Sequence, residues 1–193
     1  MDTQIRFVGM IVFGLILGVA AMVQAAPPDP YDAVPAIVEL ADNLDRPDLE
    51  RKARYIVSKY DSCDISQIFQ PKSKGGAGIG SAVQAGHADS IKSLVQHWSG
   101  PKPPTEIELR THRKDLLKTA RVLKVMAELA PFRLALIVPK NDAKKVEFMN
   151  KVIVDFKAST RDLHDAIEKT EPVATRKAAV FLNQTCNNCH ELR

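Results

Sequence analysis

Apolar residues recur at steps of three and four along most of this 193-residue chain, and that spacing constrains the fold more than any other feature. Such a period places the apolar side chains on one face of a helix, whereas a half-buried strand alternates apolar and polar residues. No segment of the sequence convincingly alternates in this way, so no sheet is expected. The sequence therefore predicts an all-α protein.

Four amphipathic segments carry the helical period. The first opens at Asp32, a plausible N-cap, and is interrupted at Pro47, where it is expected to restart. Thr105 and Glu108 form a capping box that opens the second segment, which is expected to end at Pro131. The four segments cover residues 32–60, 105–130, 141–167 and 172–190.

The last two segments also begin with recognisable signals. Asn141 or Asp142 can cap the third helix, and Pro172 suits the first turn of the fourth. Helices of about 20 to 28 residues span about 30 to 40 Å, and short links join the last three. We therefore expect an antiparallel four-helix bundle, up-down-up-down, with an insertion between the first and second helices.

The expected insertion covers residues 61–104 and differs from the helical segments in composition. Its stretch 71–81 has four glycines in six consecutive residues, which is typical of a loop. It does not match a phosphate-binding motif, because Ser81 stands where the dinucleotide fingerprint needs glycine and Lys74 precedes the glycines. A short helix is expected at residues 85–98.

Residues 1–25 have the pattern of a secretory signal peptide. Arg6 precedes an uncharged apolar run at residues 8–23, and the small residue Ala25 offers a cleavage site. The run is shorter than the roughly 20 residues that cross a bilayer, so cleavage is favoured over a membrane anchor formed by an uncleaved N-terminal helix. We expect residues 26–193 to form a single exported, periplasmic domain.

The charge balance bears on the partners. The formal net charge is +4, and aromatic residues make up only 6% of the chain. A mild positive excess suits an acidic partner protein, but it is too diffuse to indicate nucleic acid. No run of lysines and arginines is interleaved with aromatic residues, so nucleic acid is not expected as a partner.

Two of the three cysteines stand beside a histidine in the sequence CNNCH, at Cys186, Cys189 and His190. C-x-x-C-H is the attachment signature of c-type haem. Residues three apart lie on one face of a helix, so both thiols can reach the vinyl groups of one haem while the histidine binds its iron. The motif predicts one covalent haem c, with Cys186 and Cys189 as thioether attachments and His190 as the proximal iron ligand.

Other uses of the motif fit less well. A thioredoxin-like C-x-x-C follows a strand, and none is expected. A zinc site needs a fourth ligand, from Cys63 or a distant histidine, and adjacent Cys189 and His190 make poor tetrahedral geometry. A disulfide between Cys186 and Cys189 closes a small, strained ring. Cys63 is most simply an unpaired thiol.

A helical bundle whose C-x-x-C-H motif lies in the last turns of its last helix resembles the cytochrome c′ family, the class II c-type cytochromes. The resemblance covers the architecture of residues 32–190, while its match at the level of residues is Cys186, Cys189 and His190. It implies a monohaem domain, with these residues as the two attachments and the proximal ligand. Dimers are common in that family, which makes a homodimer possible here.

The other side of the iron decides between electron transfer and gas binding. In low-spin members of the resembling family, a methionine on the first helix is the sixth ligand. The first segment here has no methionine or histidine and offers aliphatic side chains instead, so an aliphatic distal pocket is the simplest expectation. Weaker candidates for a sixth ligand are His87 and His97, whereas Met126 and Met149 are expected to fill the core. The aliphatic side chains of the first segment are Ile37, Val38, Leu40 and Leu44.

These observations predict an exported monohaem c-type cytochrome that transfers single electrons to a redox partner and is not an enzyme. The alternative within the same class is a five-coordinate haem protein that binds nitric oxide or carbon monoxide. A different class is a thiol-redox or zinc-binding protein that uses the C-x-x-C motif. A subunit of a larger redox complex, with the insertion as its docking surface, is a further alternative.

Overall fold

The computed structural model describes residues 32–83 and 89–191. The predicted signal peptide at 1–25 and the candidate ligand His87 lie outside these residues. Every regular element of the described residues is helical, which confirms the all-α prediction. The α-helices are α1 (Ala33–Ala41), α2 (Leu49–Lys59), α3 (Ser62–Ser66), α4 (Ile91–Trp98), α5 (Glu106–Thr111), α6 (Arg113–Ile137), α7 (Ala143–Glu168) and α8 (Pro172–Glu191), and the 3₁₀ helices are η1 (Gln67–Phe69), η2 (Lys72–Lys74) and η3 (Gly80–Ala82).

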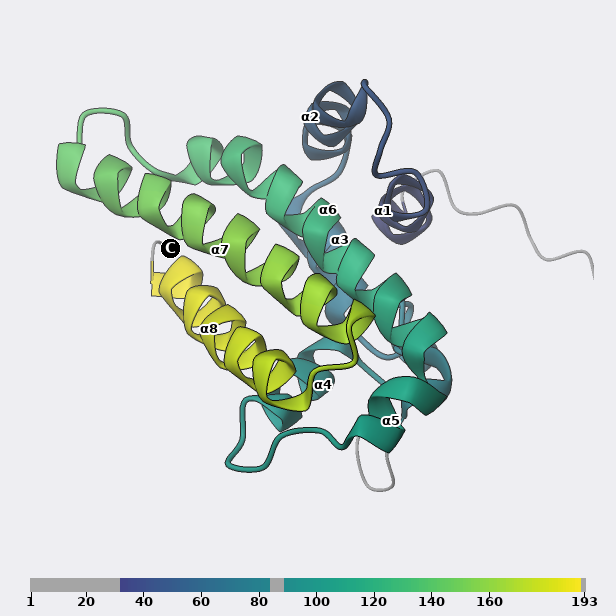
Figure 1. Ribbon diagram of the computed structural model, residues 1–193. Helices are drawn as coiled ribbons and strands as arrows, with labels where there is room; N and C mark the ends of the chain where they lie inside the picture. The colour runs from purple at the N-terminus through teal and green to yellow at the C-terminus, as the bar shows by residue number, and fades with distance from the viewer. Residues whose placement is uncertain (1–31, 84–88, 192–193) are drawn as a thin grey trace, which may run out of the picture.

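Three long helices make up the C-terminal half (Figure 1). α7 lies between α6 and α8 and packs extensively against both, whereas α6 and α8 make few direct contacts with each other. The links at 138–142 and 169–171 are short. Each helix turns an apolar face inward, and α8 buries residues at steps of three and four, as its sequence period predicts. These buried residues of α8 are Thr175, Ala178, Ala179, Leu182 and Thr185.

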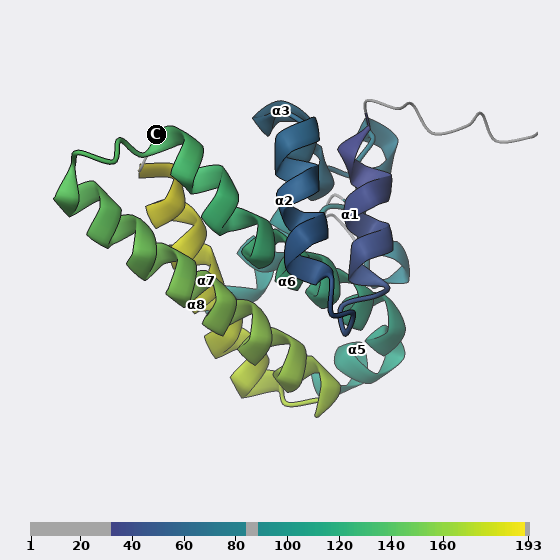
Figure 2. The same cartoon turned by 90° about the horizontal axis from the view of Figure 1, so that it is seen from above.

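The first amphipathic segment forms two helices. α1 ends at Ala41, turns occupy the residues around Pro47, and α2 then lies beside α1 (Figure 2). The restart at Pro47 is therefore confirmed, but a single long first helix was wrong. Proline lacks the N–H that would continue a helical ladder, and both short helices bury more apolar surface by packing separately on α6.

Several predicted helix starts are confirmed. The Asp32 carboxylate accepts a hydrogen bond from the Val34 N–H at 2.9 Å. Thr105 and Glu108 form both hydrogen bonds of the capping box, although the helix they open breaks after one and a half turns at His112. A side-chain oxygen at each of these positions satisfies a backbone donor that the first helical turn leaves free.

The other helix limits follow from caps and packing. Asp142, rather than Asn141, caps α7 by accepting from the Lys145 N–H at 3.0 Å, and Pro172 is the first residue of α8. The predicted end of the second segment at Pro131 was wrong, because α6 continues to Ile137. Proline removes one intrahelical donor, but burial of the next turns outweighs that loss. Those turns bury Leu134 and Val138 against Val152 of α7.

The glycine-rich stretch is a loop, as predicted, and carboxylates anchor it. Asp89 accepts from the Ile79 N–H, and Asp115 of α6 accepts from the Ser81 N–H at 2.7 Å and from the Ser81 hydroxyl at 2.5 Å. Gly78 and Gly80 adopt positive φ, and a Cβ on either would strike one of these carboxylates. The glycines therefore let the backbone approach the two aspartates closely.

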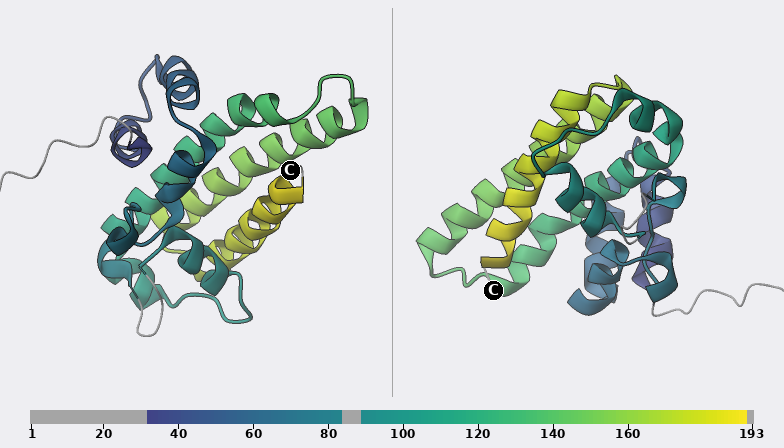
Figure 3. Two further views of the ribbon diagram at one scale, coloured as in Figure 1. Left: turned by 180° about the vertical axis from the view of Figure 1, so that it is seen from behind. Right: turned by 90° about the horizontal axis from the view of Figure 1, so that it is seen from below.

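The predicted short helix is α4, which begins at Ile91, with Ser90 as its N-cap. It packs against α8, and Figure 3 shows it beside the beginning of that helix. The Arg176 Nε of α8 donates to the Gly100 carbonyl oxygen at 2.6 Å, just after α4 ends. Trp98, only 2% exposed, is part of the core on this side. These contacts hold the start of α8 in place.

Candidate functional site

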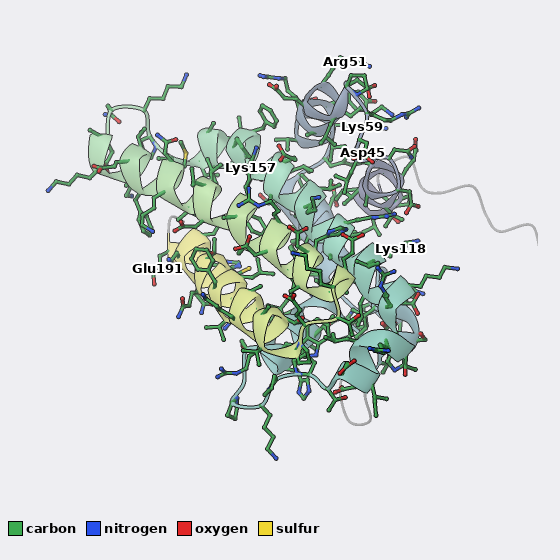
Figure 4. The ribbon with its side chains drawn as sticks, in the orientation of Figure 1. Asp45, Arg51, Lys59, Lys118, Lys157 and Glu191 are labelled. Atoms are coloured by element: carbon green, nitrogen blue, oxygen red, sulfur yellow. The ribbon has the colours of Figure 1, made fainter. Side chains whose placement is uncertain are left out.

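The CNNCH motif lies in the last two turns of α8. Cys186 and Cys189 are half-buried, and His190 is exposed at the rim. Their spacing of three places both sulfur atoms on the same side of the helix, as the sequence predicts. Figure 4 labels Glu191, which follows His190 and marks this end of α8. The motif is therefore helical and is held on the molecule by the buried residues that precede it in α8.

All three motif residues line one open cleft. The cleft holds about 920 Å³ of space not filled by atoms, a volume that includes its open mouth. Most of its surface is apolar. The wall facing α8 comes mainly from one stripe of α6, formed by Met126, Leu129, Ala130, Arg133, Leu134 and Ile137.

The remaining lining comes from α7 and from the start of the expected insertion. Phe156 of α7 is buried at the cleft, between the walls from α6 and α8. Ile65 and Phe69 add apolar surface from α3 and η1, together with the hydroxyls of Ser62 and Ser66. The cleft exists because α6 and α8 both pack on α7 and leave space between themselves.

The environment of Cys186 bears on its chemistry. Burial raises the pKa of the Cys186 thiol to about 11, and the neighbouring Cys189 adds a smaller effect in the same direction. Burial acts in this way because it disfavours the charged thiolate. At neutral pH Cys186 is therefore a neutral thiol. Reactive thiols of redox proteins have lowered pKa values, so the raised pKa of Cys186 fits a redox thiol poorly.

The described residues contain one cluster whose donor atoms are close enough to share a metal ion, formed by His164, Asp165 and Glu168 on α7. It is largely exposed and separate from the motif. Cys186, Cys189 and His190 do not form such a cluster with one another or with Cys63, which is exposed in α3. The described residues thus hold no preformed zinc site at the motif.

The wall opposite the motif does not come from the first segment, contrary to expectation. Ile37 and Leu40 are buried in the core, and none of the four expected aliphatic residues lines the cleft. The segment folds back at Pro47, so its apolar stripe packs on α6 and leaves the cleft to α3, η1 and α6. His97 is exposed on α4 and does not line the cleft either.

Two lining residues were not assigned to the site from the sequence. Met126 is 8% exposed and belongs to the core, as predicted, but it also reaches the cleft. Among the described residues of the lining, Arg133 is the one that carries a permanent charge. The only sequence signal for Arg133 is its spacing, because it falls at the helical period of the apolar residues on either side.

The residues present fit a covalently attached haem. The ring needs an apolar cleft, two thiols on one side and an imidazole beside them, and the cleft provides all three. The half-buried thiols face the apolar wall of α6, while His190 lies at the rim. A macrocycle between α6 and α8 would contact residues that otherwise line open space.

Comparison with known proteins adds no relative. No protein-family model matches the chain, and no curated protein and no solved structure is significantly similar to it. None of the described helices is long and apolar enough to span a membrane.

Proposed function

We propose that this chain is an exported c-type cytochrome that carries one covalent haem c and transfers single electrons in the periplasm. The observation that carries the proposal is the position of the C-x-x-C-H motif along one wall of an apolar cleft. Export rests on the signal-peptide pattern at residues 1–25. The mild positive charge suits an acidic redox partner.

Each motif residue has a defined task in this proposal. Cys186 and Cys189 would hold the ring through two thioether bonds, each formed if a thiol S–H adds across one vinyl group, with no atom lost. His190 would provide an imidazole nitrogen as ligand to the iron. The bound iron supplies the one-electron couple. The apolar residues of α6 and α7 exclude water and keep the site in a low-dielectric environment.

For the finer fold, we infer a bundle of the cytochrome c′ type in which α6, α7 and α8 alternate in direction. Their short links and extensive packing support this arrangement. In place of one long first helix, the short helices α1 and α2 pack on α6, and α4 packs on α8. A homodimer, common in the resembling family, stays a prediction.

A second candidate function is reversible binding of nitric oxide or carbon monoxide at an open iron position. The aliphatic character of the wall opposite the motif favours it, since side chains such as Leu129 and Ala130 cannot bind iron. The lining contains one further soft donor, the thioether of Met126. The spectrum with carbon monoxide separates the two functions, because a strong sixth ligand blocks the gas.

The test uses the full chain, expressed with its leader together with a haem-maturation system. Wild-type protein is expected to keep its haem through acid–acetone extraction and to show one haem per chain. The double variant C186A/C189A should release all of it. The matched control is C63A, which removes the exposed third cysteine and should keep the haem.

Two results would contradict the proposal. Wild-type protein without covalent haem would favour a thiol-redox or zinc protein, which metal analysis and thiol titration would then identify. Equal haem retention by C186A/C189A and C63A would show that the motif does not hold the haem. Wild-type protein with haem and a high-spin reduced spectrum shifted by carbon monoxide would support the gas-binding function over electron transfer.

A further inference from the structure

Arg133 occupies an unusual place for a charged residue. It lies on the stripe of α6 that faces the cleft, one turn from Ala130 and two turns from Met126, and its side chain is half-buried. Apolar residues of α6 surround it in the lining, and Leu134 next to it is buried. A guanidinium keeps its charge at all accessible pH values, so this charge is permanent.

The described residues provide no anion for this charge. Arg133 takes part in none of their ion pairs or hydrogen bonds, although other cations of the same region do. Glu128, an acidic residue of the same helix, is paired with Lys157 of α7 at 2.7 Å. Arg54, which lies over the ring of Phe132 beside Arg133, is itself a cation. A half-buried charge without a partner is unfavourable.

We propose that Arg133 binds a carboxylate of the molecule that fills the cleft. The inference rests on the proposed function, in which that molecule is haem c and the carboxylate is a haem propionate. Arginine suits this task because its planar group can hold a carboxylate with two parallel hydrogen bonds. The ligand thus supplies the anion that the described residues do not provide.

The pairing has a consequence for the iron. A propionate balanced by Arg133 adds little net negative charge near the iron, whereas a free propionate favours the ferric form. Loss of the guanidinium should therefore lower the midpoint potential. It should also let the propionate take up a proton at a higher pH, because a nearby cation stabilises the carboxylate. The midpoint potential of the protein without the guanidinium would then change with pH over a range in which that of wild type stays constant.

The experiment is a spectroelectrochemical titration of the haem-loaded full chain over a range of pH. The variants are R133Q, which removes the charge, and R133K, which keeps it. The matched control is R121Q, which removes an exposed arginine from the same helix. We expect R133Q to lower the equilibrium constant for reduction of the iron about tenfold, which equals a fall of about 59 mV in the midpoint potential of a one-electron couple. Its midpoint potential should also become dependent on pH, because the propionate now gains a proton within the range tested. R133K should keep most of the potential, and R121Q should match wild type.

Each other outcome overturns the inference. If R133Q matches R121Q, Arg133 has no partner on the haem. If R133Q lowers the potential but gains no ionisation, the arginine acts only as a distant charge. If R133Q does not fold, R133M takes its place with the same expectations, because it removes the charge without adding a polar amide to the apolar wall. Wild-type protein without covalent haem would remove the proposed function and this inference together, whereas an indifferent R133Q in haem-loaded protein removes only the inference.

Discussion

The two halves of the molecule reach a helical structure in different ways. In the long-helix group, α6 to α8, long apolar stripes pack along α7 and bury most of the inward faces. In the N-terminal segment, residues 32–83 and 89–111, prolines and glycines divide the chain into short helices. Carboxylate and hydroxyl caps and loop contacts hold these pieces. Both halves bury apolar residues, and in the N-terminal segment capping and loop hydrogen bonds also hold the short helices in place.

The largest effect is expected from a substitution that disrupts the packing of the long-helix group. Leu182 of α8 is fully buried three residues before Thr185 and just ahead of the motif. Leu182→Ala removes buried apolar volume and should lower the free energy of unfolding by about 2–5 kcal/mol. Denaturant titration of protein with matched haem content measures the change.

The control for Leu182 is Val173→Ala in the same helix. Val173 is 75% exposed, so its truncation should change stability by no more than about 0.5 kcal/mol. Equal effects of the two substitutions would show that α8 is not held by its buried face.

The next effect falls on the glycine-rich loop of the N-terminal segment. A Cβ at Gly80 would lie 2.7 Å from the Asp115 Cγ, and Gly80 has φ +60°. Gly80→Ala should therefore displace Asp115 from Ser81 and strain the backbone, at a cost of roughly 2–4 kcal/mol. The thermal midpoint and the denaturant midpoint both measure this loss.

Gly75 offers the matched comparison within the same loop. It has φ +83°, but a Cβ there would meet nothing within 4 Å. Gly75→Ala should cost only the backbone strain, about 1–2 kcal/mol. A loss for Gly80→Ala no larger than that for Gly75→Ala would mean that the contact with Asp115 does not stabilise the loop.

The difference between the halves also explains what could be predicted. Caps such as Asp32 and Asp142 depend on a few neighbouring residues, so the sequence shows them directly. The position of the motif on one helix face follows in the same way from the spacing of Cys186 and Cys189. A proline is a less reliable signal, because α6 continues past Pro131, where burial of Leu134 stabilises the next turn.

The contacts between distant segments could not be predicted. Whether the first segment continues or folds back at Pro47 depends on the surface that α6 offers, and local spacing does not show that surface. The same holds for Ile65 and Phe69, which reach the cleft from a stretch that looked like an insertion. Arg133 was missed because a charged residue on an apolar stripe shows its role only when the cleft beside it is known.

A smaller effect, in pH, tests the carboxylate that anchors the loop. The hydroxyl and then the backbone N–H of Ser81 hold the pKa of Asp115 below its ordinary value of 3.8. A lowered pKa in the folded state means that the stabilisation is complete above pH 3.8 and disappears as the pH falls through the folded pKa. Asp115→Asn should therefore lose stability at pH 6, by about 1 kcal/mol or less because the site is exposed.

The same variant should match wild type more closely at low pH. As the pH falls below 3.8 and through the lowered pKa of the folded state, the wild-type carboxyl becomes protonated, and its advantage over asparagine disappears. Urea midpoints at a series of pH values measure the gap. Asp45→Asn, at an exposed turn residue labelled in Figure 4, is the control and should show no such convergence. A gap for Asp115→Asn that stays constant down to low pH would contradict this assignment.

The smallest effect lies at one of the contacts that join the two halves. The Arg54 guanidinium of α2 lies 4.5 Å from the centre of the Phe132 ring of α6. A cation over an aromatic face at an exposed site contributes about 0.5–1 kcal/mol. Arg54 also forms an exposed ion pair with Glu50 at 3.2 Å, so a single substitution would mix the two contacts.

A double-mutant cycle separates them. Arg54→Gln and Phe132→Leu are measured singly and together, and the expected coupling is about 0.5 kcal/mol. Arg51→Gln, which loses an ion pair with Asp48 on the same helix but has no aromatic partner, should show no coupling to Phe132→Leu. If the Arg54 cycle also closes to zero, α2 is held on α6 by its buried face alone, through Ala53, Ile56 and Val57. The N-terminal segment would then depend on apolar burial at its junction with α6 as much as the long helices do along their length.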